Sequence, residues 1–262
     1  MSAYASALSE HPLTATAVGE AVGQVLEALP GPASFAAVFV TVAHGGALED
    51  VLGVVDAVLS PEVVVGVAAE GVLGPRRAVE GSAAISVWAA TGVPARLLVA
   101  EGASAPDWGD LQAQSVVVLF ADPYSFDAAG ALRALGGAHP GVPVVGGFAS
   151  AARGPGGNRL GTVGSVRSRG AVGAVLQARA RVSPGDPWPG DVSYEGVSSA
   201  ALAFPALRSY AHEGPSAADL ADTLGDALDR PAVAGFTAAG VFGPGPGGNS
   251  VHPEGTVIGL FG

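Results

Sequence analysis

The stretch VVVGVAAEGVLGPRRAVEGSAAISVW, from Val63 to Trp88, decides the fold that we predict for this chain. Its pattern is that of an apolar strand, a glycine-rich connection and a second apolar strand. Residues 144–176 begin VVGGFASAARGPGGNRL and end GAVGAVL, and residues 233–261 begin VAGFTAAGVFGPGPGGNSV and end TVIGLF. The pentapeptide GPGGN stands in both later copies. This shared order of apolar run, glycines, Gly-Pro and apolar run indicates an internal repeat.

Each copy is preceded by an apolar run and a segment with helical spacing. The runs are SFAAVFVTVA (34–43), SVVVLFA (115–121) and AALAFPALRSY (200–210), and the helical segments are LEDVLGVVDAVL (48–59), FDAAGALRALGGA (126–138) and SAADLADTLGDALDR (216–230). We therefore predict that each unit folds as a strand, a helix and two further strands. Continuously apolar strands are covered on both faces. We expect an α/β (α+β) fold of internally repeated β-α-β-β units that form mixed sheets with helices packed outside.

The remaining segments complete the predicted organisation. Residues 14–29 have apolar side chains at helical spacing and end at Pro30-Gly31-Pro32, which predicts a helix outside the units. ARLLVAEG (95–102) predicts a further strand. Residues 179–199 are rich in proline and glycine and predict a linker. The domains expected are thus residues 1–178 with two units, the linker, and residues 200–262 with the third.

Composition excludes several classes of function. The 262 residues include no cysteine, which excludes disulfides, thiolate metal sites and cysteine nucleophiles. All 12 basic residues are arginine, which excludes a Walker A lysine and a Schiff base. A net charge of −11 argues against nucleic acid. No apolar run reaches the roughly 18 residues of a membrane span, and the start lacks a basic leader region. These features predict a cytoplasmic protein, and the Ala/Gly/Pro/Arg-rich composition is typical of a bacterial one.

The glycine-rich motifs carry a resemblance to a known family. VVGVAAEGV with EGSAAISVWAA, followed by VPVVGGFASA and RGAVGAVL, resembles the N-terminal module of the FIST family of bacterial sensory domains. AGFTAAGVFGPGPGGNSVHPEGTVIGLF resembles the end of a FIST C-terminal module, in shortened form. The resemblance implies a signal-input domain for a small ligand, such as an amino acid or another small anionic metabolite, with an output partner such as a kinase or cyclase. The family's glycine pattern falls on Gly66, Glu70, Gly71, Gly146, Gly147, Gly240, Pro244 and His252.

The residues themselves suggest where a ligand would bind. Glycine-rich bends let backbone amides approach a ligand, and asparagine adds a donor and an acceptor. Equivalent loops of three similar units are expected to converge at one end of the fold. The alternative is that each glycine only permits a turn. Convergence predicts a cleft lined by Glu70, Gly71, Gly147, Arg153, Asn158, Asn249 and His252.

Other functions stay open at this point. His44, Asp122 and His212 occupy equivalent strand-to-helix turns and would hold a metal only if the turns met; the alternative is that they are surface residues. A further alternative that the resemblance implies is a haem-based gas sensor, since some FIST relatives bind haem, and His252 is then the histidine we prefer as its axial ligand. Carboxylate pairs such as Glu70/Glu80 would suit an enzyme, or the remnant of one, with a pseudo-threefold cleft. No spacing supports a catalytic triad, so we expect a non-enzyme. A ligandless scaffold that dimerises through a sheet edge is a further alternative.

Overall fold

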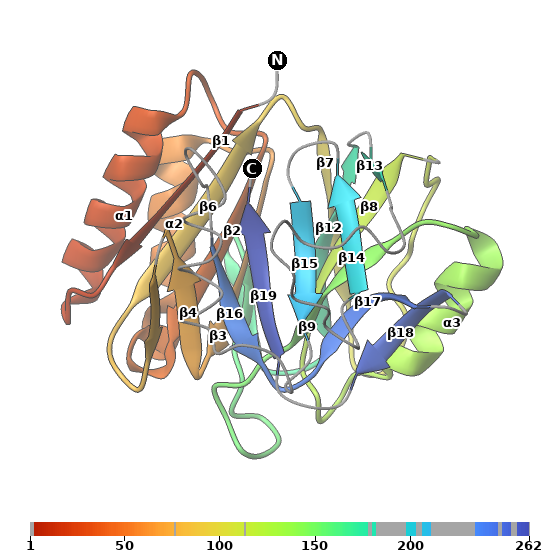
Figure 1. The fold of residues 1–262 in the computed structure, drawn as a ribbon. Coiled ribbons are helices and arrows are strands. Elements are labelled where there is room, and N and C mark those ends of the chain that lie inside the picture. Colours follow the sequence, from red (N-terminus) through yellow and green to blue (C-terminus); the bar gives the residue numbers. More distant parts are fainter. Residues whose placement is uncertain are drawn as a thin grey trace, which may run out of the picture.

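The fold comes from a computed structural model that describes residues 3–75, 77–112, 114–177, 180–181, 198–202, 206–210, 234–245, 248–252 and 256–261. Three six- or seven-stranded sheets make up most of this part of the chain. Figure 1 shows the first sheet on the left, the second on the right and the third across the front. The predicted helix at residues 216–230 and the side chain of His212 lie outside the described residues.

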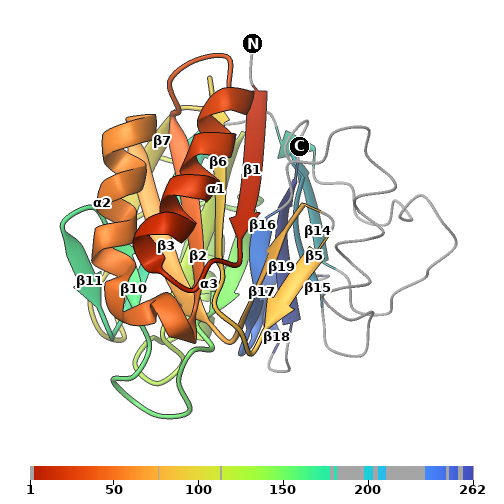
Figure 2. The ribbon, with the colours of Figure 1, turned by 90° about the vertical axis from the view of Figure 1, so that its left-hand side faces the viewer.

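The first sheet has the strand order β1-β6-β2-β3-β10-β11. Only β2 and β3 run parallel, since α2 carries the chain from one to the other. The strands are β1 (Ala3–Ser9), β6 (Ile85–Thr91), β2 (Phe35–Thr41), β3 (Val63–Ala69), β10 (Leu160–Thr162) and β11 (Ser165–Arg167). Helices α1 (Thr14–Ala28) and α2 (Leu48–Leu59) lie side by side on its outer face (Figure 2). A short 3₁₀ helix, η1 (Val42–Ala47), leads into α2.

The second sheet has the order β18-β17-β9-β8-β12-β7. Here β8 and β9 are the parallel pair, joined by α3 (Ala128–Ala138). Asp127 caps this helix by accepting a hydrogen bond from the Gly130 amide. The strands are β18 (Gly248–His252), β17 (Val241–Gly245), β9 (Val144–Phe148), β8 (Ser115–Ala121), β12 (Ala171–Gln177) and β7 (Ala95–Ala100).

The third sheet combines strands from the first third of the chain with strands from its last third. Its order is β13-β14-β15-β19-β16-β4-β5. The strands are β13 (Ala180–Arg181), β14 (Ser198–Leu202), β15 (Ala206–Tyr210), β19 (Thr256–Phe261), β16 (Ala234–Ala238), β4 (Gly71–Gly74) and β5 (Arg77–Glu80). The linker predicted at residues 179–199 thus has strand residues at both of its ends, and the domain division stays a prediction.

Three hairpins tie the sheets together, and each pairs with a strand of another unit. Hairpin β4–β5 follows β3 but pairs with β16. Hairpin β10–β11 follows β9 but pairs with β3, and hairpin β17–β18 follows β16 but pairs with β9. The glycine-rich connections predicted between strands are therefore hairpins. Each hairpin belongs to a different sheet from the strand that it follows. The internal repeat itself stays a prediction.

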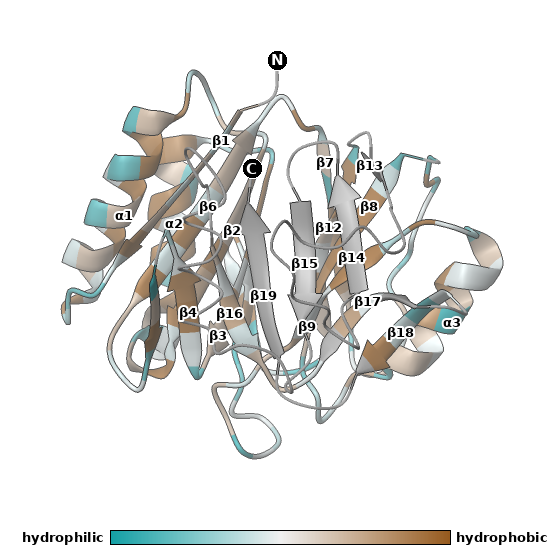
Figure 3. Cartoon of the chain, in the orientation of Figure 1, coloured by the Kyte–Doolittle hydropathy of each residue, from teal (hydrophilic) through white to brown (hydrophobic). Residues whose placement is uncertain are grey.

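Alternate residues of the central strands enter different cores. In β2, Phe35, Ala37 and Phe39 face a core shared by the three sheets. Ala36, Val38 and Val40 face α1 and α2 instead. The hydropathy colours of Figure 3 show the matching helix faces, brown toward the sheet and teal toward solvent. A third cluster joins α3 to the second sheet. The expectation that continuously apolar strands are covered on both faces is confirmed.

Most predicted elements are found at or near their expected bounds. The predicted helices at residues 14–29, 48–59 and 126–138 are α1, α2 and α3, and the predicted strand at residues 95–102 is β7. One expectation was wrong: the described residues of the segment predicted as one strand at 200–210 belong to two strands, β14 and β15, that pair with each other. The α+β class with mixed sheets is confirmed. Within the described residues, no helix combines the length and the apolar character needed to cross a bilayer.

Candidate functional site

Segments that follow β3 and β9 meet β16 at one end of the fold. The amide of Glu70 donates to Ser150 Oγ at 2.9 Å, and the amide of Gly71 donates to Thr237 Oγ1 at 2.8 Å. Ser150 Oγ in turn donates to the backbone carbonyl of Thr237. These four residues come from three different units of the sequence. We call Glu70, Gly71, Ser150 and Thr237 the junction.

Small residues allow the backbones to approach so closely. The amide of Phe148 donates to the carbonyl of Gly240 at 2.8 Å, and the amide of Ala239 donates to the carbonyl of Phe148 at 3.0 Å. Ala149 is fully buried, and its amide donates to the carbonyl of Ala121 at 2.8 Å. Because Ala149 has no exposed surface, a larger side chain at this position would require its neighbours to shift.

Three of the predicted site residues lie at or beside the junction. Glu70 and Gly71 belong to it, and the Glu70 side chain is exposed. Gly147 is buried in β9, where it pairs with Val241. The ligand cleft predicted from the convergence of equivalent segments stays a prediction. Glu70 is the charged group that the junction presents to solvent.

Two glycines of the family pattern have a packing role. A Cβ on Gly66 would lie 2.9 Å from Leu52 Cδ2, because α2 rests on β3 at this point. Gly146 has φ +142°, and a Cβ there would overlap the carbonyl oxygen of Leu119 in β8. Gly146 therefore excludes larger residues for reasons of both space and backbone conformation, whereas a larger residue at Gly66 would require the Leu52 side chain to shift. Their presence does not require a ligand.

Asn158 lies in a buried polar network beneath the loop that leaves the junction. Its side chain is fully buried. Oδ1 accepts a hydrogen bond from the Ala152 amide at 3.0 Å, and Nδ2 donates to Asp122 Oδ1 at 2.9 Å. Asp122 is also fully buried and accepts a second bond from Ser125 Oγ at 2.6 Å. Asn158 thus helps to fix the loop that begins at Ser150. Both its amide oxygen and its amide nitrogen are hydrogen-bonded within the protein.

Asn249 occupies a different place, although it ends the same pentapeptide. Its Oδ1 accepts from the Val144 amide at 3.0 Å, and its Nδ2 donates to the Val142 carbonyl at 2.7 Å. These contacts are at the start of β9, whereas Ser150 follows the end of that strand. Four residues of extended chain separate the two ends by about 13 Å. The structure does not bring Asn249 to the junction.

The two remaining predicted site residues, Arg153 and His252, lie on different segments. Arg153 is exposed and stands three residues after Ser150, on the loop that starts at the junction. His252 is in β18, where it pairs with Val241, and its side chain lies outside the described part. Haem binding through His252 therefore stays an expectation. Pro244, also part of the family pattern, is in β17 and its side chain is likewise not described.

His44 and Asp122 are the two described members of the predicted metal-binding set, and both are buried. His44 is 1% exposed, and its Nδ1 lies 2.9 Å from Thr14 Oγ1. Burial lowers the pKa of His44, and the nearby backbone of His11 offsets part of this effect. Asp122 accepts hydrogen bonds from Asn158 and Ser125, as described above. No cluster of three or more metal-ligating side chains is found among the described residues.

Ser150 and Thr237 are junction residues that were not predicted from the sequence. A signal for Ser150 was present, since it stands four residues after Gly146, just as Glu70 stands four residues after Gly66. The equivalent residue after Gly235 is Ala239, which is exposed beside the junction. Thr237 has no such signal, because its hydroxyl meets Gly71 only through the exchange of hairpin β4–β5 into the third sheet.

Comparison of the sequence with known proteins identifies a family and several relatives. The model of the FIST N domain matches residues 34–185, which is more than half of the chain. The uncharacterized protein Rv0628c of Mycobacterium tuberculosis is 32% identical over 184 residues, 67% of this chain and 48% of that protein. The uncharacterized protein Mb0898c of Mycobacterium bovis is 33% identical over 165 residues, 60% of this chain and 43% of that protein. This chain spans about half the length of these relatives. It belongs to the FIST N domain family.

Proposed function

We propose that this chain is a signal-input module that binds a small zwitterionic metabolite, such as an amino acid, at the junction. FIST domains are generally sensory domains of signal-transduction proteins. The observation that carries the proposal is the hydrogen-bonded meeting of Glu70, Ser150 and Thr237 from three units. A ligand held there contacts segments from all three sheets. Its binding can therefore change how the sheets are held together.

The charges near the junction favour a zwitterion over a simple anion. Glu70 offers a carboxylate to an ammonium group, and Arg153 on the adjoining loop offers a guanidinium to a carboxylate. The chain as a whole carries a net charge of −11, which repels free anions at long range. A zwitterion avoids most of this repulsion. The role proposed is binding, with no bond made or broken in the ligand.

The proposal is tested by a thermal-shift screen of the purified chain against amino acids and small carboxylates. A ligand that binds only the folded state adds about 2.7 kcal/mol of stability at 100 times its Kd. We expect Glu70→Gln and Arg153→Ala to weaken binding of the hit. Glu101→Gln and Arg133→Ala change exposed charges outside the junction and are the matched controls. A hit bound equally by all four variants, or no hit at all, would refute the assignment.

The signalling partner belongs to the same proposal. An output protein such as a kinase or cyclase would have to distinguish the ligand-bound from the free chain. Cross-linking of the chain to a candidate output protein, with and without the identified ligand, measures this coupling. Equal cross-linking in both states would argue against an input role.

A further inference from the structure

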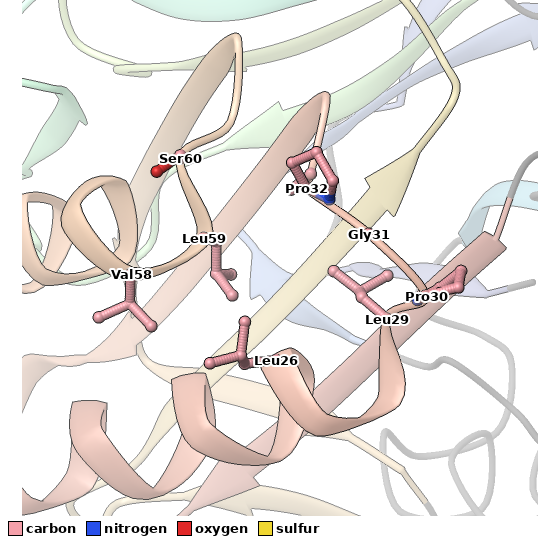
Figure 4. A pocket seen from close by; sticks show the side chains of 9 residues that line it. Leu26, Leu29, Pro30, Gly31, Pro32, Val58, Leu59 and Ser60 are labelled. Atoms are coloured by element: carbon pink, nitrogen blue, oxygen red, sulfur yellow. The ribbon is translucent and has the colours of Figure 1, made fainter.

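An apolar groove lies at the other end of β2 from the junction, between the C-terminal ends of α1 and α2. It has a volume of about 360 Å³ and is lined by Leu26, Leu29, Pro30, Gly31, Pro32, Ala33, Val58, Leu59 and Ser60. Figure 4 shows Leu26 and Leu29 of the α1 end facing Val58 and Leu59 of the α2 end across it. Leu26 is 50% exposed and Val58 is 42% exposed. Two large apolar side chains are thus left in water at one opening.

The segments that line the groove belong to a part of the sequence whose charged residues are all acidic. Residues 1–75 contain no lysine or arginine and eight carboxylates, Glu10, Glu20, Glu27, Glu49, Asp50, Asp56, Glu62 and Glu70. Every charged residue of α1 and α2 is therefore acidic. Glu27 adjoins Leu26 and is exposed, and Glu62 lies just beyond Ser60 and is also exposed. The surface beside the groove carries carboxylates with no basic residue of its own segment to balance them.

The two helix ends add to this negative potential. A helix C-terminus carries a partial negative charge equivalent to about half an electron. Proteins often place a basic side chain in the last turn to offset it, but neither α1 nor α2 has one. Both helices end at the groove, α1 at Ala28 and α2 at Leu59. A cation at this opening would interact favourably with both helix ends and with Glu27.

We propose that this groove is a docking site for a partner protein segment that carries one or two apolar anchors flanked by arginine or lysine. The volume of the groove suits one or two aliphatic side chains. The flanking bases complement Glu27, Glu62 and the helix C-termini, which provides orientation and speeds association. An amphipathic helix laid into a groove is a common form of such recognition.

Charge also argues against the other occupants of such a groove. A second copy docked through the same face would bring carboxylates against carboxylates, which is unfavourable. Phospholipid surfaces in cells are predominantly anionic and would be repelled. A basic segment of another protein has neither problem. The groove and the junction lie at opposite ends of a seven-residue strand, about 20 Å apart, so partner docking and ligand binding do not compete for space.

The test uses three labelled peptides and the whole chain. The first is a short helical peptide with two leucines one turn apart and flanking arginines, the second has glutamate for arginine, and the third has alanine for leucine. We expect the first to bind most tightly by fluorescence anisotropy, with an affinity that falls as salt is added. Leu26→Asp and Val58→Asp should each weaken it about tenfold, since each removes apolar area that the peptide covers and places a carboxylate there instead. Glu27→Lys should weaken it about threefold at low salt.

Matched controls locate the binding on the surface. Leu13 is 65% exposed near the opposite end of α1, so Leu13→Asp should leave the affinity unchanged. Glu101→Lys should do the same. Methyl NMR should show shifts at Leu26, Leu29 and Val58 but none at Val163, which is exposed elsewhere. The proposal is overturned if the acidic peptide binds equally well, if Leu26→Asp binds like the parent chain, or if the free chain is a dimer that Leu26→Asp dissociates. Circular dichroism establishes that the variants are folded.

Discussion

His44 is the residue whose surroundings most clearly differ from those expected of a surface turn. It is buried beneath the start of α1, and its Nε2 has no hydrogen-bond partner among the described residues. The other ring nitrogen, Nδ1, lies within hydrogen-bond distance of the Thr14 hydroxyl. A protonated ring would place a positive charge in this buried position with little compensation, which is why burial lowers the pKa.

The lowered pKa makes stability depend on pH. An unfolded histidine takes up a proton below about 6.5, whereas the folded ring stays neutral to lower pH. The free energy of unfolding should therefore be highest above about 6.5 and fall as pH decreases from there to the pKa of the folded state. Urea unfolding across this range measures the slope. His44→Gln cannot titrate, so it should show a smaller slope, and equal slopes in the two proteins would contradict this account.

Asn158 is expected to contribute to stability through its buried network. Asn158→Ala leaves Asp122 Oδ1 and the Ala152 amide without the partners that they have now. A buried polar group without a partner costs about 1–3 kcal/mol. We expect a loss of this size in the free energy of unfolding from urea titration. Arg153→Ala, on the same loop but exposed, should change it by no more than about 0.5 kcal/mol. Equal effects of the two substitutions would show that the network is unimportant.

At the scale of single elements, glycine has opposite roles in strand and helix. In β9, Gly146 has a positive φ and faces the Leu119 carbonyl without room for a Cβ. In α2, Gly53 has open space around the position of a Cβ. The same substitution, glycine to alanine, should therefore have opposite signs at the two sites.

We predict that Gly146→Ala destabilises the protein by roughly 2–4 kcal/mol, because backbone strain adds to steric overlap. Gly53→Ala should stabilise it by about 0.5–1 kcal/mol, because alanine loses less backbone entropy in a helix. Both values come from urea unfolding of the two variants and the parent chain. A neutral result for Gly146→Ala would mean that β8 and β9 can separate without cost.

At the scale of the whole molecule, three phenylalanines join the three sheets. Phe39 of β2, Phe120 of β8 and Phe236 of β16 are each fully buried. Their ring centroids are 5.4 to 5.6 Å apart in every pair. Such contacts add to the burial of apolar area. The cluster lies in the shared core and belongs to no single sheet.

Loss of one ring should weaken all three interfaces together. Phe236→Ala is expected to lower the free energy of unfolding by about 3–5 kcal/mol, a large part of the total for a typical domain. Phe236→Leu should cost less, because it keeps part of the volume. Tyr124→Ala, at a side chain that is 45% exposed, is the control. Hydrogen exchange should show faster exchange in strands of all three sheets, and a change confined to the third sheet would contradict a shared core.

Much of the fold follows from local patterns. The bounds of α2 and β8 match the predicted segments at residues 48–59 and 115–121. These elements are predictable because the spacing of apolar residues fixes which faces are buried, whatever packs against them. Glu70 and Gly71 contact later segments of the chain, and the predicted ligand cleft stays a prediction. The contacts of Glu70 and Gly71 with Ser150 and Thr237 depend on how the units are arranged around the shared core.

What the sequence determined by itself is the three described helices, the long apolar strands next to them and the family resemblance, since these rest on local pattern. What only the tertiary structure decided is which strand each hairpin pairs with and what each asparagine contacts. The two GPGGN copies are identical, yet Asn158 binds buried Asp122 while Asn249 binds the start of β9. Identical local sequences cannot specify this difference. It depends on partners 36 and 105 residues away in the chain, brought close only when hairpins are exchanged among the sheets.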